Sequence, residues 1–128
     1  MKHHVLVLDD EADVRTAIRL QLKDTRYEIL EAENAQQAIE LLGDNAITVD
    51  VIICDVRMPG ISGVEAVEHF QREYPTTPVI VLTGFPDVTL AVDFMKKKDV
   101  VDYLTKPVDK QKLVAAVEKA AQKRKMFD

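Results

Sequence analysis

The segment Val51-Ile52-Ile53-Cys54-Asp55 places a carboxylate directly after four consecutive apolar residues. A short run of this kind predicts a β-strand whose two faces are both buried, as they are in a parallel sheet covered by helices. Similar β-rich segments recur along the chain, and four of the five are nearly continuous in apolar residues. The predicted strands are His4–Leu8, Tyr27–Ala32, Val51–Cys54, Val79–Thr83 and Val101–Thr105.

Between the predicted strands lie segments whose apolar residues recur with the period of an α-helix. This alternation predicts five βα units, and right-handed crossovers leave few topologies for them. For a chain of 128 residues we expect an α/β fold, a doubly wound five-stranded parallel sheet of the flavodoxin-like kind, with strand order 2-1-3-4-5 and five flanking helices. The predicted helices are Ala12–Lys23, Ala35–Leu42, Gly63–Glu73, Val88–Lys97 and Lys110 to about Arg124.

Length and composition predict one domain over residues 1–128, because 47% hydrophobic residues can form one core. The longest apolar run, residues 49–54, is interrupted by Asp50 and is much shorter than the roughly 20 residues that span a bilayer. The first residues also lack the features of a signal peptide. We therefore expect a cytoplasmic protein without a membrane contact, in which the single cysteine, Cys54, is a buried apolar residue.

The formal net charge of −5 argues against direct binding of nucleic acid by this domain. A basic cluster near the C-terminus is the exception. Such a cluster at the end of a helix favourably meets the helix dipole, and we expect a solvated face there. Its members are Lys119, Lys123, Arg124 and Lys125.

Polar side chains follow the predicted strands at one edge of the sheet. Asp9 and Asp10 come after the first strand, Asp55 after the third and Lys106 after the fifth, while Thr83 ends the fourth. In sheets of this type ligands bind at the carboxyl ends of the strands, so we expect these residues to converge. Carboxylates brought together repel one another strongly unless a cation lies between them.

Oxygen ligands without a histidine or cysteine partner favour a hard cation, and Mg²⁺ typically takes one or two carboxylates, water and phosphate oxygens. A zinc site is disfavoured because His3, His4 and Cys54 have no ligand spacing. The sequence therefore predicts a magnesium site.

An aspartate can attack phosphorus to form an acyl phosphate, and Asp55 is placed for that reaction. Lys106 would neutralise a phosphoryl oxygen, and Thr83 would donate a hydroxyl hydrogen bond to it. The segment after Asp55 contains Gly60, so a backbone carbonyl near Arg57 can turn inward as a further metal ligand.

Four motifs together resemble the receiver domain of bacterial two-component response regulators, in order and over nearly the whole chain. They are Val7-Leu8-Asp9-Asp10-Glu11, Cys54-Asp55-Val56-Arg57-Met58-Pro59-Gly60, Leu82-Thr83-Gly84 and Asp102-Tyr103-Leu104-Thr105-Lys106-Pro107.

The resemblance implies a phosphoprotein switch in which Asp55 is the phosphoacceptor. It implies that Asp10 and Asp55 bind Mg²⁺ directly, that Asp9 binds it through water, and that the backbone carbonyl of Arg57 is the third protein ligand. Lys106 would pair with the phosphoryl group.

The resemblance also implies a cis peptide bond between Lys106 and Pro107 and a switch pair, Thr83 and Tyr103. Thr83 would move toward the phosphate and Tyr103 would turn inward, which changes the output face formed by the fourth helix, fifth strand and fifth helix. The turn at Lys96–Val100 is about one residue longer than is common in the family, so this face is where the chain departs from the pattern.

The implied partners are a sensor histidine kinase or a phosphotransfer protein as donor, and a downstream output domain or partner protein. Homodimer formation on phosphorylation is a further expectation. The domain would not be an enzyme in the usual sense, because it catalyses only its own phosphorylation and slow dephosphorylation. We expect residues 1–128 to be either the whole protein or the N-terminal part of a longer regulator.

Other functions compete with the switch. An aspartate-nucleophile phosphatase would need a second acid where Arg57 stands, and a flavin module would meet repulsion from Asp9, Asp10 and Glu11. A phosphate-independent adaptor, a pseudo-receiver, stays open as the alternative, although such a domain would be free to lose one member of the acceptor, metal and lysine set.

Overall fold

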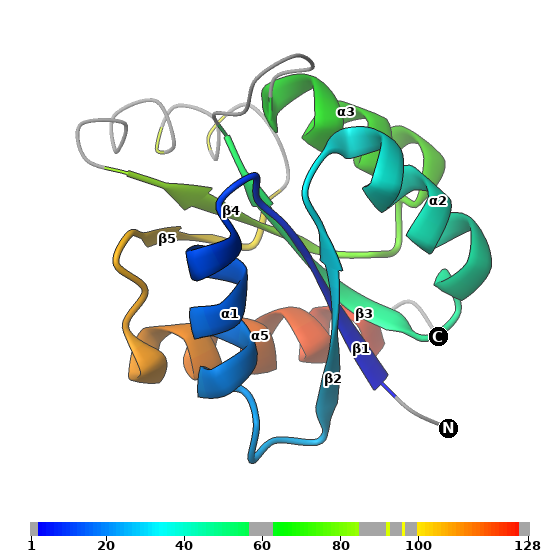
Figure 1. The fold of residues 1–128 in the computed structure, drawn as a ribbon. Coiled ribbons are helices and arrows are strands. Elements are labelled where there is room, and N and C mark those ends of the chain that lie inside the picture. Colours follow the sequence, from blue (N-terminus) through cyan, green and yellow to red (C-terminus); the bar gives the residue numbers. More distant parts are fainter. Residues whose placement is uncertain (1–2, 57–62, 85–91, 93–95, 97–99, 126–128) are drawn as a thin grey trace.

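The structure, a computed structural model, describes residues 3–56, 63–84, 92, 96 and 100–125. Five parallel strands form one sheet in the order β2-β1-β3-β4-β5, which confirms the predicted topology (Figure 1). The strands are β1 His3–Leu8, β2 Tyr27–Ala32, β3 Val49–Asp55, β4 Val79–Thr83 and β5 Asp102–Thr105. The helices are α1 Ala12–Gln21, α2 Ala35–Asn45, α3 Gly63–Glu73 and α5 Lys110–Lys125.

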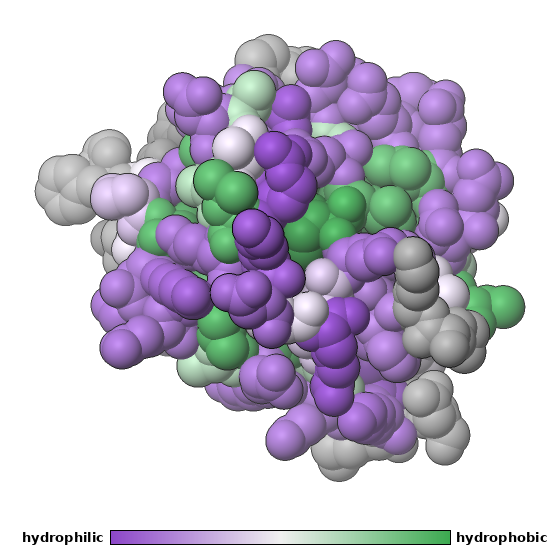
Figure 2. All heavy atoms as spheres, turned by 60° about the horizontal axis from the view of Figure 1, so that its bottom comes forward, coloured by the Kyte–Doolittle hydropathy of each residue, from purple (hydrophilic) through white to green (hydrophobic). Residues whose placement is uncertain are grey.

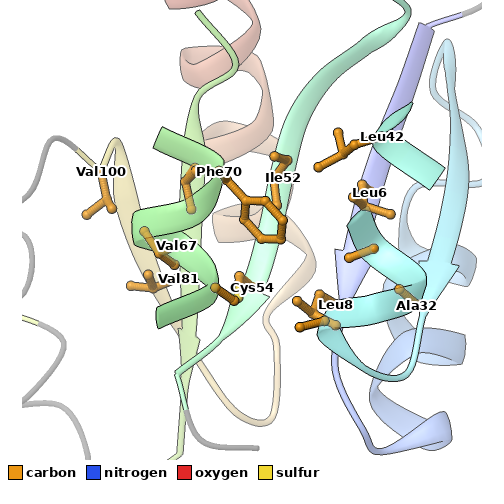
Figure 3. Close-up of a cluster of buried hydrophobic side chains, with 14 of the residues drawn as sticks. Leu6, Leu8, Ala32, Leu42, Ile52, Cys54, Val67, Phe70, Val81 and Val100 are labelled. Carbon is orange, nitrogen blue, oxygen red and sulfur yellow. The ribbon is translucent and has the colours of Figure 1, made fainter. Parts of the chain in front are cut away.

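The helices cover both faces of the sheet (Figure 1). One hydrophobic cluster joins α2 and α3 to one face, and a second cluster joins α1 and α5 to the other. Successive residues of a strand point to opposite faces, so Ile52 of β3 belongs to the first cluster and Ile53 to the second. In Figure 3 the ring of Phe70, which is fully buried, points from α3 toward Ile52. This double coverage explains why the strands read as continuous apolar runs.

Cys54 lies in β3 and is fully buried in the first cluster, beside Leu8 in the strand register (Figure 3). Burial raises the pKa of its thiol well above the usual range. A thiol that stays protonated is a poor nucleophile and a poor metal ligand. The prediction that Cys54 is a buried apolar residue is therefore confirmed.

Two helix ends differ from their predicted positions. Helix α2 runs to Asn45 instead of Leu42, because Gly43 is accommodated in the last turn, and α1 ends at Gln21. The predicted helix Val88–Lys97 lies almost entirely outside the described residues; the two described positions within it, Val92 and Lys96, are helical.

The expectation of a solvated basic face is wrong for Arg124, whose side chain is only 13% exposed. Its guanidinium donates to Thr77 Oγ1 at 2.8 Å and to the carbonyls of Ala46 and Ile47 at 3.2 Å each. Asp50 lies 3.4 Å away as the counter-charge. These contacts fix the last turn of α5 to the loops before β3 and β4. They also give hydrogen-bond donors to loop carbonyls that are removed from water.

The face at the bottom of Figure 1 carries mainly hydrophilic side chains, with smaller hydrophobic areas between them (Figure 2). Among the described residues, the exposed large apolar side chains are Leu20 and Ile47. Isolated apolar residues of this kind are ordinary on protein surfaces. No described helix combines the length and the apolar character needed to cross a membrane.

Candidate functional site

The described residues of the predicted site lie at the carboxyl ends of β1, β3, β4 and β5. Asp9 directly follows β1, Asp55 ends β3, and Leu8 pairs with Cys54 in the register of these two neighbouring strands. The backbone N–H of Lys106 donates to the carbonyl of Thr83 at 2.9 Å, which extends the pairing of β4 and β5 by one bond. Parallel pairing therefore gathers residues that are nearly a hundred positions apart in the sequence.

A cluster of carboxylates occupies this edge. Asp9, Asp10, Glu11 and Asp55 each offer an oxygen, and these atoms lie within 4.8 Å of one another. Asp9 is fully buried and Asp55 is 4% exposed, whereas Asp10 and Glu11 are exposed. Buried carboxylates this close to one another need a cation to offset their repulsion.

Lys106 supplies part of that positive charge. Its Nζ atom lies 2.8 Å from Asp9 Oδ2, 2.9 Å from Asp55 Oδ2 and 3.0 Å from Glu11 Oε1. Burial alone would lower the pKa of the ammonium, but its close contacts with the three carboxylates outweigh burial and raise the pKa. The ammonium of Lys106 therefore stays protonated, and it contacts all three carboxylates at the centre of the site.

Asp9 is the carboxylate with the clearest electrostatic cost. Its burial raises its pKa, while Lys106 and the backbone N–H of Glu11 oppose the shift and the charge of Asp55 adds to it. Oδ1 accepts the Glu11 N–H at 2.8 Å. Oδ2 is ion-paired with Lys106 but receives no hydrogen bond of good geometry from the described residues.

These residues fit a hard divalent cation. The available donors are oxygens, and the buried Oδ2 of Asp9 has bonding capacity left over. Asp9, Asp10 and Asp55 would hold the ion. The predicted carbonyl ligand of Arg57 lies outside the described residues.

The raised pKa of Asp9 predicts a pH-dependent stability. The folded protein holds this proton more tightly than the unfolded chain, so the contribution of Asp9 to stability is greatest at acidic pH and is lost as the pH rises through the folded-state pKa. Asp9→Asn cannot ionise, so the variant does not lose stability in this way as the pH rises. Without Mg²⁺, we expect the variant to melt at a higher temperature than wild type at pH 7, with the difference shrinking on acidification.

Thermal melts followed by circular dichroism in EDTA, at several pH values, measure this effect. A variant that is less stable than wild type at pH 7, or a difference independent of pH, would contradict it. Adding Mg²⁺ should stabilise wild type more than Asp9→Asn, because the cation offsets a charge that the variant lacks.

The proposed switch residues flank this cluster. Thr83 is fully buried, and its hydroxyl donates to the carbonyl of Gly84 at 3.3 Å. Tyr103 lies on β5 opposite Val81 of β4, and its side chain is partly buried against the first hydrophobic cluster. The Lys106–Pro107 peptide bond is cis. The roles of Thr83 and Tyr103 stay predictions.

The structure adds two residues whose contacts were not predicted. Glu11 holds Lys106 although it is 61% exposed, and Arg15 contacts the backbone of Asp9. Spacing was the available signal for both. Glu11 directly follows the acidic pair, and Arg15 lies one helical turn further on, where residues four apart share a face.

The family model of the response regulator receiver domain matches residues 5–118. The transcriptional regulatory protein FixJ of Bradyrhizobium diazoefficiens is 32% identical over 93% of this chain and 57% of its own length. The DNA-binding transcriptional regulator NtrC of Escherichia coli K12 is 33% identical over 91% of this chain and 24% of its own length. The chain thus spans only part of these curated relatives. The crystal structure of a response regulator receiver domain protein from Clostridium thermocellum superposes with a TM-score of 0.89, at 31% identity, covering 98% of this chain and 99% of that one.

Proposed function

The chain belongs to the response regulator receiver domain family of two-component systems, and from that premise we propose that it is a signalling switch whose Asp55 accepts a phosphoryl group. The observation that carries this proposal is the contact of Lys106 Nζ with both Asp55 and Asp9, two buried carboxylates at one sheet edge. This contact brings together the phosphoacceptor Asp55, the cation of Lys106 and carboxylates that could bind a metal.

The transfer is a substitution at phosphorus. A carboxylate oxygen of Asp55 forms a bond to phosphorus while the bond to the donor's imidazole nitrogen breaks, and the imidazole leaves with that electron pair. Bound Mg²⁺ would supply positive charge for the phosphoryl oxygens. In the later hydrolysis, a water oxygen bonds to phosphorus while the bond from phosphorus to the Asp55 oxygen breaks. This step releases inorganic phosphate and restores the carboxylate of Asp55.

Lys106 is placed to exchange partners in this reaction. Its ammonium is shared among three carboxylates before transfer. After transfer, the phosphoryl oxygens on Asp55 would carry roughly 1.5 to 2 negative charges in place of the single charge of its carboxylate. The stronger charge draws the ammonium from exposed Glu11 toward the phosphoryl oxygens. Thr83, at the end of β4, would donate its hydroxyl to the same group.

The output face is proposed around Tyr103. An open hollow of ≈ 310 Å³ lies between β5 and α5, lined by Asp102, Tyr103, Leu104, Thr105, Lys112 and Ala115. Inward rotation of Tyr103, in the space that Thr83 leaves, would reshape this hollow. Phosphorylation then acts as a population shift between two packings of one fold.

We propose a histidine kinase or phosphotransfer protein as donor, and an output domain or partner protein as receiver of the signal. The relatives named above are longer than this chain, and their names describe transcriptional regulators. An output module on the same chain or on another protein would bind the face around Tyr103. Dimerisation on phosphorylation would use the same face.

Intact-mass analysis after incubation with acetyl phosphate tests the proposal. With Mg²⁺ we expect one phosphate adduct per wild-type chain, and with EDTA we expect the adduct to form much more slowly, because the clustered carboxylates repel the anionic donor. If no adduct forms with either acetyl phosphate or a cognate kinase, the phosphate-independent adaptor becomes the better explanation of this fold.

A further inference from the structure

Asp9 is held at its backbone as well as at its side chain. Its N–H donates to the carbonyl of Ala32 at 3.1 Å, continuing the pairing of β1 with β2. Its carbonyl oxygen accepts a hydrogen bond of 2.6 Å from Nη1 of Arg15, in the first half of α1. A guanidinium therefore fixes the main chain at the point where the acidic pair begins.

Arg15 is in turn held by an acid from another strand. Its Nε atom donates to Glu31 Oε1 of β2 at 3.2 Å, and Glu31 lies opposite Val7 in the strand register. Arg15 is 14% exposed and Glu31 is 28% exposed, so the pair is only partly screened by water. The planar fork of a guanidinium lets one side chain contact two acceptors with a fixed geometry, which a lysine cannot do.

The carbonyl of Asp9 and the N–H of Asp10 belong to one planar peptide unit. Fixing that carbonyl therefore also fixes the direction in which the chain enters Asp10. Asp10 is exposed, so few neighbours orient its side chain. The direction of that side chain therefore depends mainly on the backbone at Asp10. Arg15 thus acts on the geometry of both acidic residues without contacting either carboxylate.

We propose that Arg15, held by Glu31, is a positioning residue that presents the Asp9–Asp10 pair to the divalent cation of the switch. The inference rests on the function proposed above and extends it by two residues that the acceptor, metal and lysine set does not include. Residues that orient metal ligands change metal affinity by about 10-fold to 100-fold when they are replaced.

Arg19 provides a matched control on the same helix. It also contacts Glu31, and it is 50% exposed. Its described contacts do not include the acidic pair. Replacing Arg19 removes a guanidinium, a positive charge and an ion pair with Glu31, but leaves the bond to the Asp9 carbonyl in place.

The first experiment measures Mg²⁺ affinity from the rise in melting temperature with Mg²⁺ concentration, by circular dichroism because the chain has no tryptophan. We expect Arg15→Met to weaken Mg²⁺ binding about tenfold, and Arg19→Met to weaken it far less. Arg15→Lys and Glu31→Gln should give intermediate losses, because each keeps part of the arrangement. These two milder variants decide the question if Arg15→Met does not fold.

The second experiment needs no metal. Hydrogen exchange of the backbone amides at Asp9, Asp10 and Glu11 is compared in EDTA, and we expect faster exchange in the Arg15 variants than in Arg19→Met. Equal affinities and equal exchange rates in the Arg15 and Arg19 variants would overturn the inference. A wild type that does not respond to Mg²⁺ would instead overturn the metal site of the proposed function, and the inference with it.

Discussion

Asp55→Asn is expected to abolish formation of the phosphate adduct. The carboxylate oxygen of Asp55 is the proposed nucleophile, and a neutral amide is a far weaker one. The replacement is nearly isosteric at a residue that is 4% exposed, and an amide oxygen can still accept the 2.9 Å bond from Lys106. The fold should therefore persist while acceptance is lost. Intact mass after incubation with acetyl phosphate and Mg²⁺ measures the difference directly.

Asp44→Asn is the matched control, because Asp44 is an exposed residue of α2, away from the sheet edge that holds the site. It removes the same charge and should form the adduct as wild type does. Circular dichroism of both variants checks that the fold is retained. Stable labelling of Asp55→Asn at another residue would refute the assignment of Asp55 as the acceptor.

The sheet could be predicted because its strands are short and buried on both faces. Val79–Thr83 and residues 51–55 have few polar positions, which helices on both sides of a parallel sheet require. Helix ends were less predictable. Gly43 ends a helix in many contexts, but here it is tolerated inside α2, and local sequence does not distinguish the two outcomes.

The positions of the site residues along the chain were also predictable, because each follows or ends a strand at the same edge. Their contacts were not. Lys106 reaches Glu11 as well as Asp55, and Arg15 reaches a backbone carbonyl instead of a carboxylate. Spacing could place Glu11 and Arg15 near the acidic pair, but the atoms that they contact depend on side-chain torsions, which spacing does not specify.

Arg124 illustrates the same limit far from the site. Charge patterning predicted a solvated helix end, since lysine and arginine are common there. In the structure, the guanidinium of Arg124 instead donates hydrogen bonds to the loop carbonyls of Ala46 and Ile47. Which member of a basic cluster packs against the protein depends on the loops that face it, and those loops are brought near only by the complete sheet.

Lys106→Ala is expected to lower the free energy of unfolding by about 3 kcal/mol in the absence of Mg²⁺. The Lys106 side chain is 18% exposed, and its ammonium is shared among Asp9, Asp55 and Glu11, so its removal leaves two buried carboxylates without this counter-charge. Mg²⁺ should restore more stability to the variant than it adds to wild type, because the cation then offsets a larger repulsion. Urea unfolding with EDTA and with Mg²⁺ measures both effects. Lys110→Ala, at the exposed start of α5, is the control and should change stability little.

The same variant separates acceptance of phosphate from transmission of the signal. With Mg²⁺ present, Lys106→Ala should still form an adduct, because the nucleophile and the carboxylates for the metal are intact. Phosphorylation of the variant should not change hydrogen exchange over β5. Lys106 directly follows that strand and its backbone N–H is bonded to Thr83, so the ammonium that would bind the phosphoryl group is what links the phosphate to β5. Unchanged stability in EDTA would refute the role of Lys106 as counter-charge. A normal response of β5 to phosphorylation would refute its role in coupling the phosphate to Tyr103.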